Sequence, residues 1–198
     1  MISLNFQKRI FTSIILSFLL ILMYFYTYIL VISLILVSLI CWIEFYGLII
    51  RIFKKKNLKN KFLKFLIKSI SILYLFFFSL LIIFVATKNA SLEIFIIYPV
   101  FISISSDIGG IIFGKTFKGK KLTKISPNKT IIGSFGSFIF SLLMIPIFFN
   151  YFDNLQNLNI IVLTLLISLT SQLGDLFISL LKRKAKVKDR GNILPGHG

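Results

Sequence analysis

The sequence predicts an all-α polytopic membrane protein with about six transmembrane helices. Three observations support this prediction. Of the 198 residues, 57% are hydrophobic and the mean hydropathy is +0.95. Charged residues make up only 15%, whereas soluble domains usually contain about a quarter. The basic residues behind the formal net charge of +17 lie between long apolar runs, a pattern typical of membrane topology and not of nucleic-acid binding. We therefore expect a single integral membrane domain over residues 1–198 and no nucleic-acid partner.

The first apolar run, from Ile10 to Ile50, is long enough for two helices. Its 41 residues contain one charged side chain, Glu44. As a single helix the run would extend roughly 62 Å, about twice a hydrocarbon core of ~30 Å. Four aromatic residues between Tyr24 and Tyr28 suit a turn at the membrane interface, where a tyrosine hydroxyl reaches water.

Four further spans follow along the chain. We expect them at about residues 69–87, 94–113, 131–149 and 160–181, each close to the ~20 residues that a bilayer requires. The helix over 131–149 carries small residues at helical spacing, a pattern that usually serves close packing between helices. These residues are Gly133, Ser134, Ser137 and Ser141.

The distribution of charge predicts the orientation in the membrane. With the N-terminus in the cytoplasm, the cytoplasmic segments 1–9, 51–68, 115–129 and 182–190 hold two, eight, six and six basic residues, which is 22 of the 23 Lys and Arg. Basic residues concentrate in cytoplasmic loops. We therefore expect a multi-pass protein of the cytoplasmic membrane with both termini cytoplasmic, a cytoplasmic tail at 182–198, and contacts between the basic segments and anionic membrane lipids.

Two carboxylates within the predicted spans are the first candidates for a site, because charged groups at membrane depth are costly. Asp107 lies six residues before Phe113, and Asp175 lies six residues before Leu181. Both are thus about 9 Å inside the cytoplasmic ends of their helices, at similar depth. Each lies on a polar face, which predicts the wall of a wet cavity; a structural ion pair with a nearby Lys or Arg is the alternative.

Residues Gly109 to Thr116 match the phosphate-loop pattern G-x-x-x-x-G-K-[ST]. A true phosphate loop lies between a strand and a helix of a soluble α/β unit. Here a membrane span precedes the pattern and a Gly- and Lys-rich loop follows it, so we reject that identification. The glycines and lysines of the loop still suit the binding of a polyphosphate.

Two motifs resemble those of a known enzyme family. The first is Ser126-Pro127-Asn128-Lys129-Thr130, followed by Gly133; the second is Ser179-Leu180-Leu181-Lys182-Arg183, then Lys188-Asp189 and Leu194-Pro195-Gly196-His197-Gly198. Together with Leu173-Gly174-Asp175-Leu176 they are similar to phosphatidate cytidylyltransferases, also called CDP-diacylglycerol synthases, over roughly residues 9–198. The second motif matches the family signature S-x-x-K-R-x(4)-K-D-x-G-x(2)-L-P-x-H-G.

The resemblance implies a nucleotidyltransferase that makes CDP-diacylglycerol and pyrophosphate from CTP and phosphatidate, with Mg²⁺ or another divalent cation as cofactor. It implies metal binding by Asp175 and Asp107. The other implied catalytic residues are Lys182, Arg183, Lys188, Asp189 and His197. The implied substrate-binding residues are Ser126, Pro127, Lys129 and Thr130.

The sequence also departs from the family pattern. The pattern continues beyond Gly198 with a D-R-x-D segment that supplies a second metal-binding Asp, and Ile132 and Ile178 replace polar or acidic residues. We expect a fragment of a longer reading frame; a truncated, inactive membrane protein is the alternative. A CTP-dependent polyprenol-type lipid kinase and a small transporter are the other functions considered. The oligomeric state stays open, with a homodimer among the options.

Overall fold

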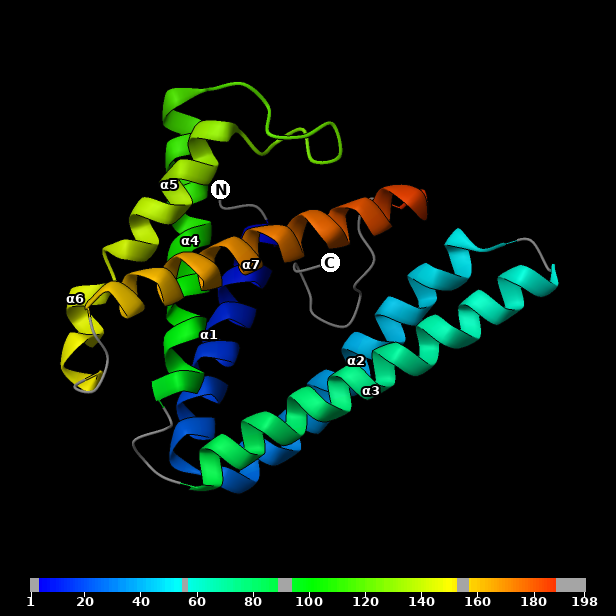
Figure 1. The fold of residues 1–198 in the computed structure, drawn as a ribbon, viewed down its shortest axis with the longest axis horizontal. Coiled ribbons are helices and arrows are strands. Elements are labelled where there is room, and N and C mark those ends of the chain that lie inside the picture. The colour runs from blue at the N-terminus through cyan, green and yellow to red at the C-terminus, as the bar shows by residue number, and fades with distance from the viewer. Residues whose placement is uncertain (1–3, 55–56, 89–93, 153–156, 188–198) are drawn as a thin grey trace. The chain divides into compact units, whose positions relative to one another are not determined.

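The chain is described by a computed structural model over residues 4–54, 57–88, 94–152 and 157–187, and this part is almost entirely α-helical. The helices are α1 (Leu4–Phe25), α2 (Thr27–Ile52), α3 (Leu58–Lys88), α4 (Ile94–Phe117), α5 (Ile131–Leu142), α6 (Ile145–Phe148) and α7 (Asn157–Lys184), with a 3-10 turn η2 (Phe149–Tyr151) after α6 (Figure 1).

The helices confirm the all-α polytopic prediction. Five segments of the described chain are long and apolar enough to cross a membrane: Thr27–Ile52, Leu58–Thr87, Ile94–Phe117, Ile131–Tyr151 and Asn157–Lys184. The sixth, α1, has a shorter apolar part, Phe11–Met23. The run from Ile10 to Ile50 divides as expected, because α1 ends at Phe25 and α2 begins at Thr27.

Two predicted spans differ from the helices that contain them. α3 begins at Leu58 and thus extends beyond the predicted span 69–87, because the Lys- and Leu-rich stretch before the apolar run is itself a good helix former. The span predicted as one helix over 131–149 is interrupted after Leu142. Pro146 has no N–H to donate to the Leu142 carbonyl, so the α-helical ladder does not continue through this point.

The chain forms two compact units. The N-terminal unit contains α1, α2, α3 and the end of α7 from Leu181, and the central unit contains α4, α5, α6 and α7 up to Leu180. In the N-terminal unit, Leu181 and Ala185 pack against Leu48 of α2. The core of the central unit surrounds Tyr98 and Ile102, which are fully buried.

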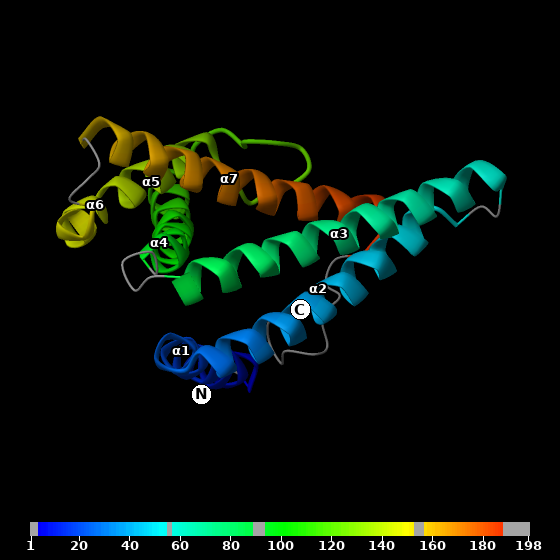
Figure 2. The same cartoon turned by 60° about the horizontal axis from the view of Figure 1, so that its bottom comes forward.

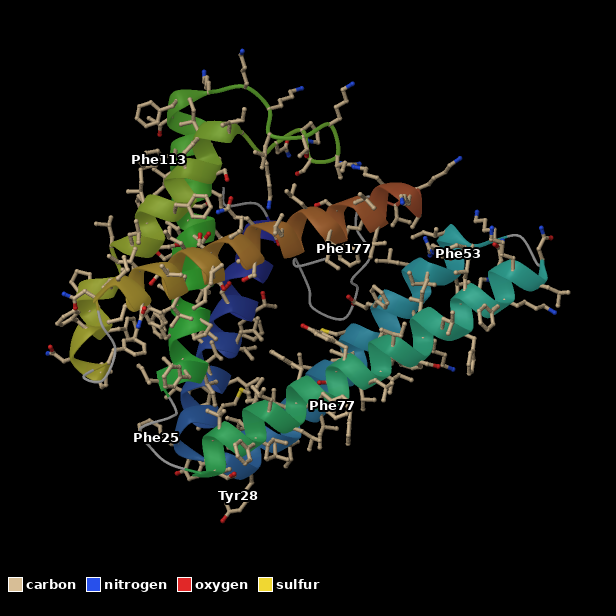
Figure 3. The ribbon with its side chains drawn as sticks, viewed as in Figure 1. Phe25, Tyr28, Phe53, Phe77, Phe113 and Phe177 are labelled. Carbon is tan, nitrogen blue, oxygen red and sulfur yellow. The ribbon has the colours of Figure 1, made fainter. Side chains whose placement is uncertain are left out.

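The apolar surface of the helices is largely uncovered by the chain itself. Phe25, Tyr28 and Phe77 project outward from their helices and are 69%, 79% and 64% exposed (Figure 3). Such a surface suits lipid, since hydrocarbon covers apolar side chains without cost. α2 and α3 lie side by side in both views of the fold (Figures 1 and 2).

Candidate active site

The loop between α4 and α5 is a small hairpin that places Lys129. Lys121 and Thr130 form an antiparallel bridge, the Leu122 N–H donates to the Lys129 carbonyl at 2.8 Å, and the Ile131 N–H donates to the Lys120 carbonyl at 2.9 Å. The hairpin closes with a turn in which the Lys129 N–H donates to the Ser126 carbonyl at 3.1 Å. Pro127 follows Ser126 in this turn, the position at which its fixed φ is favoured.

The hairpin ends directly at the start of α5. Thr130 has extended backbone angles and its Oγ1 accepts from the Gly133 N–H at 3.0 Å, which caps the helix. Beyond the cap, α5 packs closely on α4. A Cβ on Gly133 would lie 2.8 Å from the Gly110 carbonyl oxygen, and a Cβ on Gly110 would lie 2.7 Å from Ser137 Oγ. Glycine at these positions thus allows the two backbones to approach, as the small-residue pattern on α5 predicts.

These elements and α7 enclose a pocket of about 440 Å³, within the range typical of small-molecule sites. Its walls come from α4, the hairpin, α5 and α7, all within the central unit. The polar side chains that line it are Asp107, Lys115, Ser126, Asn128, Lys129, Thr130, Ser134, Ser137, Gln172 and Asp175.

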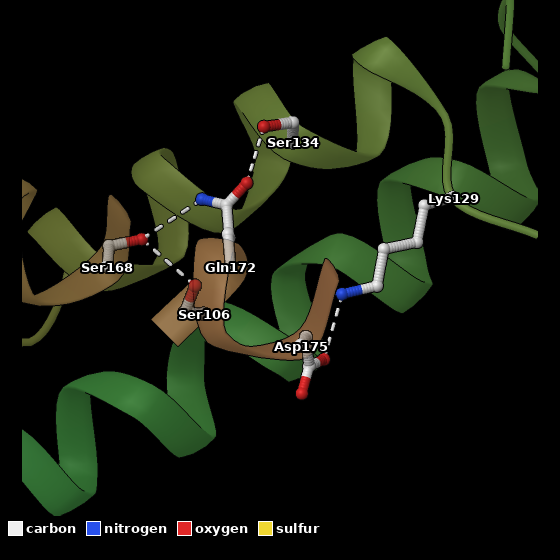
Figure 4. Close-up of polar contacts among 6 residues, drawn as sticks. All are labelled: Ser106, Lys129, Ser134, Ser168, Gln172 and Asp175. Carbon is white, nitrogen blue, oxygen red and sulfur yellow. Dashed lines mark hydrogen bonds and ion pairs between the residues drawn. The ribbon is translucent and has the colours of Figure 1, made fainter. Parts of the chain in front are cut away.

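The two predicted carboxylates both reach this pocket. Lys129 Nζ lies 2.8 Å from an Asp175 carboxylate oxygen, and these side chains are 33% and 56% exposed (Figure 4). Asp107 lines the same pocket. Asp107 and Asp175 thus line one pocket, as their equal depth predicts, and Asp175 forms the ion pair with a Lys that was the alternative interpretation.

The donor set limits what metal the pocket suits. Within the described residues there is no group of three or more His, Cys, Asp or Glu side chains. Two carboxylates in an open pocket suit Mg²⁺, which typically takes one or two carboxylates and completes its shell with water and phosphate oxygens. Among the described residues, Asp107 and Asp175 are the carboxylates of the pocket that could contact such a cation.

A chain of polar side chains extends from the pocket to the buried contact between helices, and Gln172 is the member that the sequence analysis missed. Ser134 of α5 donates to the Gln172 side-chain oxygen, and the Gln172 amide nitrogen lies 3.4 Å from Ser168 Oγ (Figure 4). Ser168 and Ser106 are fully buried and their hydroxyls are 2.9 Å apart. These contacts tie α4, α5 and α7 together beside the ion pair. Gln172 is three residues before Asp175, so its position on the same helix face was the available signal.

The predicted site residues at the end of the chain are only partly described. Lys182 and Arg183 occupy the last turn of α7, which belongs to the N-terminal unit, and neither lines the pocket. Lys188, Asp189 and His197 lie outside the described residues. Residues 109–116 are helical within α4, so the rejection of a phosphate loop is confirmed.

Comparisons with known proteins identify the family of the chain. A family model described as "Cytidylyltransferase family" matches residues 1–198. The chain is 44% identical over 119 residues to a phosphatidate cytidylyltransferase of Staphylococcus haemolyticus, covering 58% of this chain and 45% of the relative. A protein of the same name from Rickettsia typhi is 38% identical over 126 residues, covering 60% of this chain and 55% of the relative. One from Bacillus subtilis is 41% identical over 106 residues, covering 52% of this chain and 39% of the relative. The chain thus spans about half the length of the curated relatives it matches, and no solved structure matches it.

Proposed function

The chain belongs to the cytidylyltransferase family, and on this premise we propose that it transfers CMP from CTP to phosphatidate, giving CDP-diacylglycerol and pyrophosphate. The observation that carries the proposal is the pocket in which Lys129 contacts Asp175 beside Asp107. The name shared by the relatives supports phosphatidate as the acceptor.

The reaction brings two anions together. A phosphate oxygen of phosphatidate attacks the α-phosphorus of CTP, the bond from that phosphorus to the bridging oxygen of the β-phosphate breaks, and pyrophosphate leaves with the electron pair. A phosphate monoester has a second pKa of about 6 and is therefore largely dianionic at neutral pH. The nucleophile thus needs no general base, and His197 is proposed to orient a phosphate.

The residues of the pocket divide by charge. Lys129 and Lys115 would bind phosphate oxygens, since ammonium groups donate charge-assisted hydrogen bonds to them. Ser126 and Asn128 add neutral donors at the turn of the hairpin. Gln172, held by Ser134 and Ser168, would contact substrate from the α7 side.

Asp107 and Asp175 would hold Mg²⁺. When bound, the metal supplies positive charge that stabilises the triphosphate and the departing pyrophosphate. Asp175 is already paired with Lys129. Asp175 would ligate the metal through the oxygen that Lys129 does not contact, and we propose that Lys129 then turns toward a phosphate.

The proposal also covers the residues of the second motif and the side of the membrane on which the site lies. Lys182 and Arg183 follow Asp175 on α7 by two helical turns, and we assign them, with Lys188 and Asp189, to phosphate and metal contacts on the strength of the family resemblance. Positive charge in the segments 51–68, 115–129 and 182–190 supports a site on the cytoplasmic side of the membrane.

The test is label transfer from CTP by the purified chain in phosphatidate-containing bilayers. With label on the α-phosphate, the lipid product should become radioactive, and with label on the γ-phosphate it should not. Asp175→Asn should lower the rate on the order of 100-fold or more, because the loss of a metal ligand removes several kcal/mol of transition-state stabilisation.

Lys124→Gln is the matched control. Lys124 lies in the same hairpin, is exposed and does not line the pocket, so its loss should leave the rate within about twofold. Transfer of the γ-label to a lipid alcohol would identify a lipid kinase instead. Full activity of Asp175→Asn with unchanged metal dependence would refute the role given to Asp175.

A further inference from the structure

Lys68 of α3 places its ammonium against two aromatic rings of α2. Its Nζ lies 5.4 Å from the centroid of the Trp42 ring and 5.4 Å from that of the Tyr46 ring. The two rings are nearly parallel, with centroids 5.7 Å apart and an interplanar angle of 3°. None of these residues lines the pocket of the central unit. We call Trp42, Tyr46 and Lys68 the lysine-aromatic cluster.

The two helices that carry the cluster are held together within the N-terminal unit. Ser38, Trp42 and Tyr46 follow one another at intervals of four residues and therefore share one face of α2. Ser38 Oγ lies 3.0 Å from Ser79 Oγ of α3, which fixes this face toward α3. The Ser38–Ser79 contact and the cluster thus join the same face of α2 to α3.

The length of α3 sets the level of the cluster in the membrane. Its 31 residues extend about 46 Å, some 16 Å more than a hydrocarbon core of ~30 Å. Lys59, Lys61 and Lys64 occupy the first turns, whereas the helix after Lys68 is apolar to Thr87 apart from hydroxyl groups. The first ten residues therefore extend beyond the core, and Lys68 lies where the core begins. Lipid phosphates, and the Trp and Tyr of aromatic belts, occupy this level.

Two hydrogen-bond donors of the cluster have no acceptor among the described residues. In the described part of the chain, the contacts shown for Lys68 Nζ are the two rings, and no ion pair is among them. Trp42 Nε1 is buried without a hydrogen-bond partner among the described residues. Aromatic faces attract a cation but leave its charge in place. An ammonium at this level is best satisfied by an anion from the lipid.

We propose that the lysine-aromatic cluster binds an anionic phospholipid, with the lipid phosphate on the Lys68 ammonium and the glycerol region against the Trp42 and Tyr46 rings. The positive charge of Lys68 favours a lipid with an anionic headgroup, and the Trp42 and Tyr46 rings add contact area for its glycerol region. This site is independent of the proposed catalytic function, because it uses different residues and needs neither CTP nor a metal.

Trp42 is the single tryptophan of the chain, so its fluorescence reports on the cluster alone. The full chain is placed in phosphatidylcholine bilayers. In one sample a small fraction of the lipid is brominated phosphatidylglycerol, and in the other the same fraction is brominated phosphatidylcholine. Bromine on the acyl chains quenches the fluorescence of a nearby indole. Phosphatidylglycerol should bind the site with about fivefold higher affinity than phosphatidylcholine, since a basic residue near the surface favours anionic lipid by about 1 kcal/mol.

Variants at one face of α3 show whether Lys68 causes the preference. Lys68→Met should abolish it and Lys68→Arg should keep it. Lys64→Gln, one helical turn earlier, is the matched control and should retain most of it. Added salt should reduce the preference of the wild-type chain, which tests the charge without any substitution. Equal quenching by the two brominated lipids, or equal losses in Lys64→Gln and Lys68→Met, would overturn the proposal.

Discussion

Lys129 is the residue on which the proposed chemistry depends most directly, because it has two competing partners. In the structure its ammonium lies 2.8 Å from the carboxylate of Asp175. In the proposed reaction the same ammonium binds a phosphate, while Asp175 binds a metal. A divalent cation on the other oxygen of this carboxylate would repel the ammonium and weaken the ion pair, since like charges repel. Binding of the metal and departure of Lys129 from Asp175 are therefore coupled.

We predict that Lys129→Met binds a divalent cation more tightly than the wild-type chain when no nucleotide is present. An ion pair with this degree of exposure is worth at most about 1 kcal/mol, so its removal should increase affinity roughly two- to fivefold. The same variant should bind CTP more weakly, because a phosphate ligand is lost. The first effect is measured with Mn²⁺ by electron paramagnetic resonance of the unbound ion.

Lys115→Met separates the ion pair from the general charge of the pocket. Lys115 also lines the pocket, but no ion pair joins it to Asp175 in the described structure. Its substitution removes the same charge without freeing the carboxylate, so Mn²⁺ affinity should rise less. If both variants gain equally, Lys129 does not compete with the metal for Asp175.

At the scale of elements, the pocket depends on how closely α4 and α5 approach. Gly109 and Gly110 of α4 meet Gly133 and Gly136 of α5. Ser137 and Ser141 of α5 are buried at the same contact, and Ser105 donates to the Phe140 carbonyl at 2.7 Å. Small side chains thus set the distance between the two helices, and with it the place of the hairpin at the pocket mouth.

We predict that Gly133→Ala destabilises the protein by about 1–3 kcal/mol, the cost of overpacking a close contact. The new Cβ would lie 2.8 Å from the Gly110 carbonyl oxygen and 3.0 Å from Thr130 Oγ1, so α5 and its cap would have to shift. Thermal unfolding in detergent measures the effect as a lower midpoint.

Gly174→Ala is the control for this substitution. No heavy atom lies within 4 Å of a Cβ built at Gly174, and alanine favours a helix over glycine by about 1 kcal/mol. The midpoint of Gly174→Ala should therefore be equal to or above that of the wild-type chain. A lower midpoint for Gly174→Ala than for Gly133→Ala would contradict the packing argument.

Across the whole molecule, the sequence predicts best what depends on composition and depth. The helical class follows from hydropathy, and the meeting of Asp107 with Asp175 follows from their equal distance to the helix ends. The contact between Lys129 and Asp175 depends on a hairpin whose pairing of Lys121 with Thr130 leaves no mark in the sequence. Gln172 was overlooked because an uncharged amide costs less at membrane depth than a carboxylate does.

The interruption after Leu142 shows a different kind of failure. Pro146 is visible in the sequence, but the average hydropathy of residues 131–149 outweighs a single proline when spans are assigned. The predicted membrane span and the observed break in the helix are compatible, because Ile131–Tyr151 is apolar enough to cross a membrane even though its helix is interrupted. A span is thus set by the total transfer free energy of its side chains, and a helix by each backbone hydrogen bond.

The orientation of the chain is the last prediction, and this broken span allows it to be measured. Lys124, before the span, and Asn150, at its end, are both exposed, and a segment that crosses the bilayer places them on opposite sides. In a Cys41→Ser background, which removes the single cysteine, Asn150→Cys should react with a membrane-impermeant maleimide added to intact cells. Lys124→Cys should react only after the cells are opened, because its lysine-rich loop is expected in the cytoplasm. The reverse pattern would place the pocket on the outer side, where CTP is absent, and would contradict both the orientation and the proposed function.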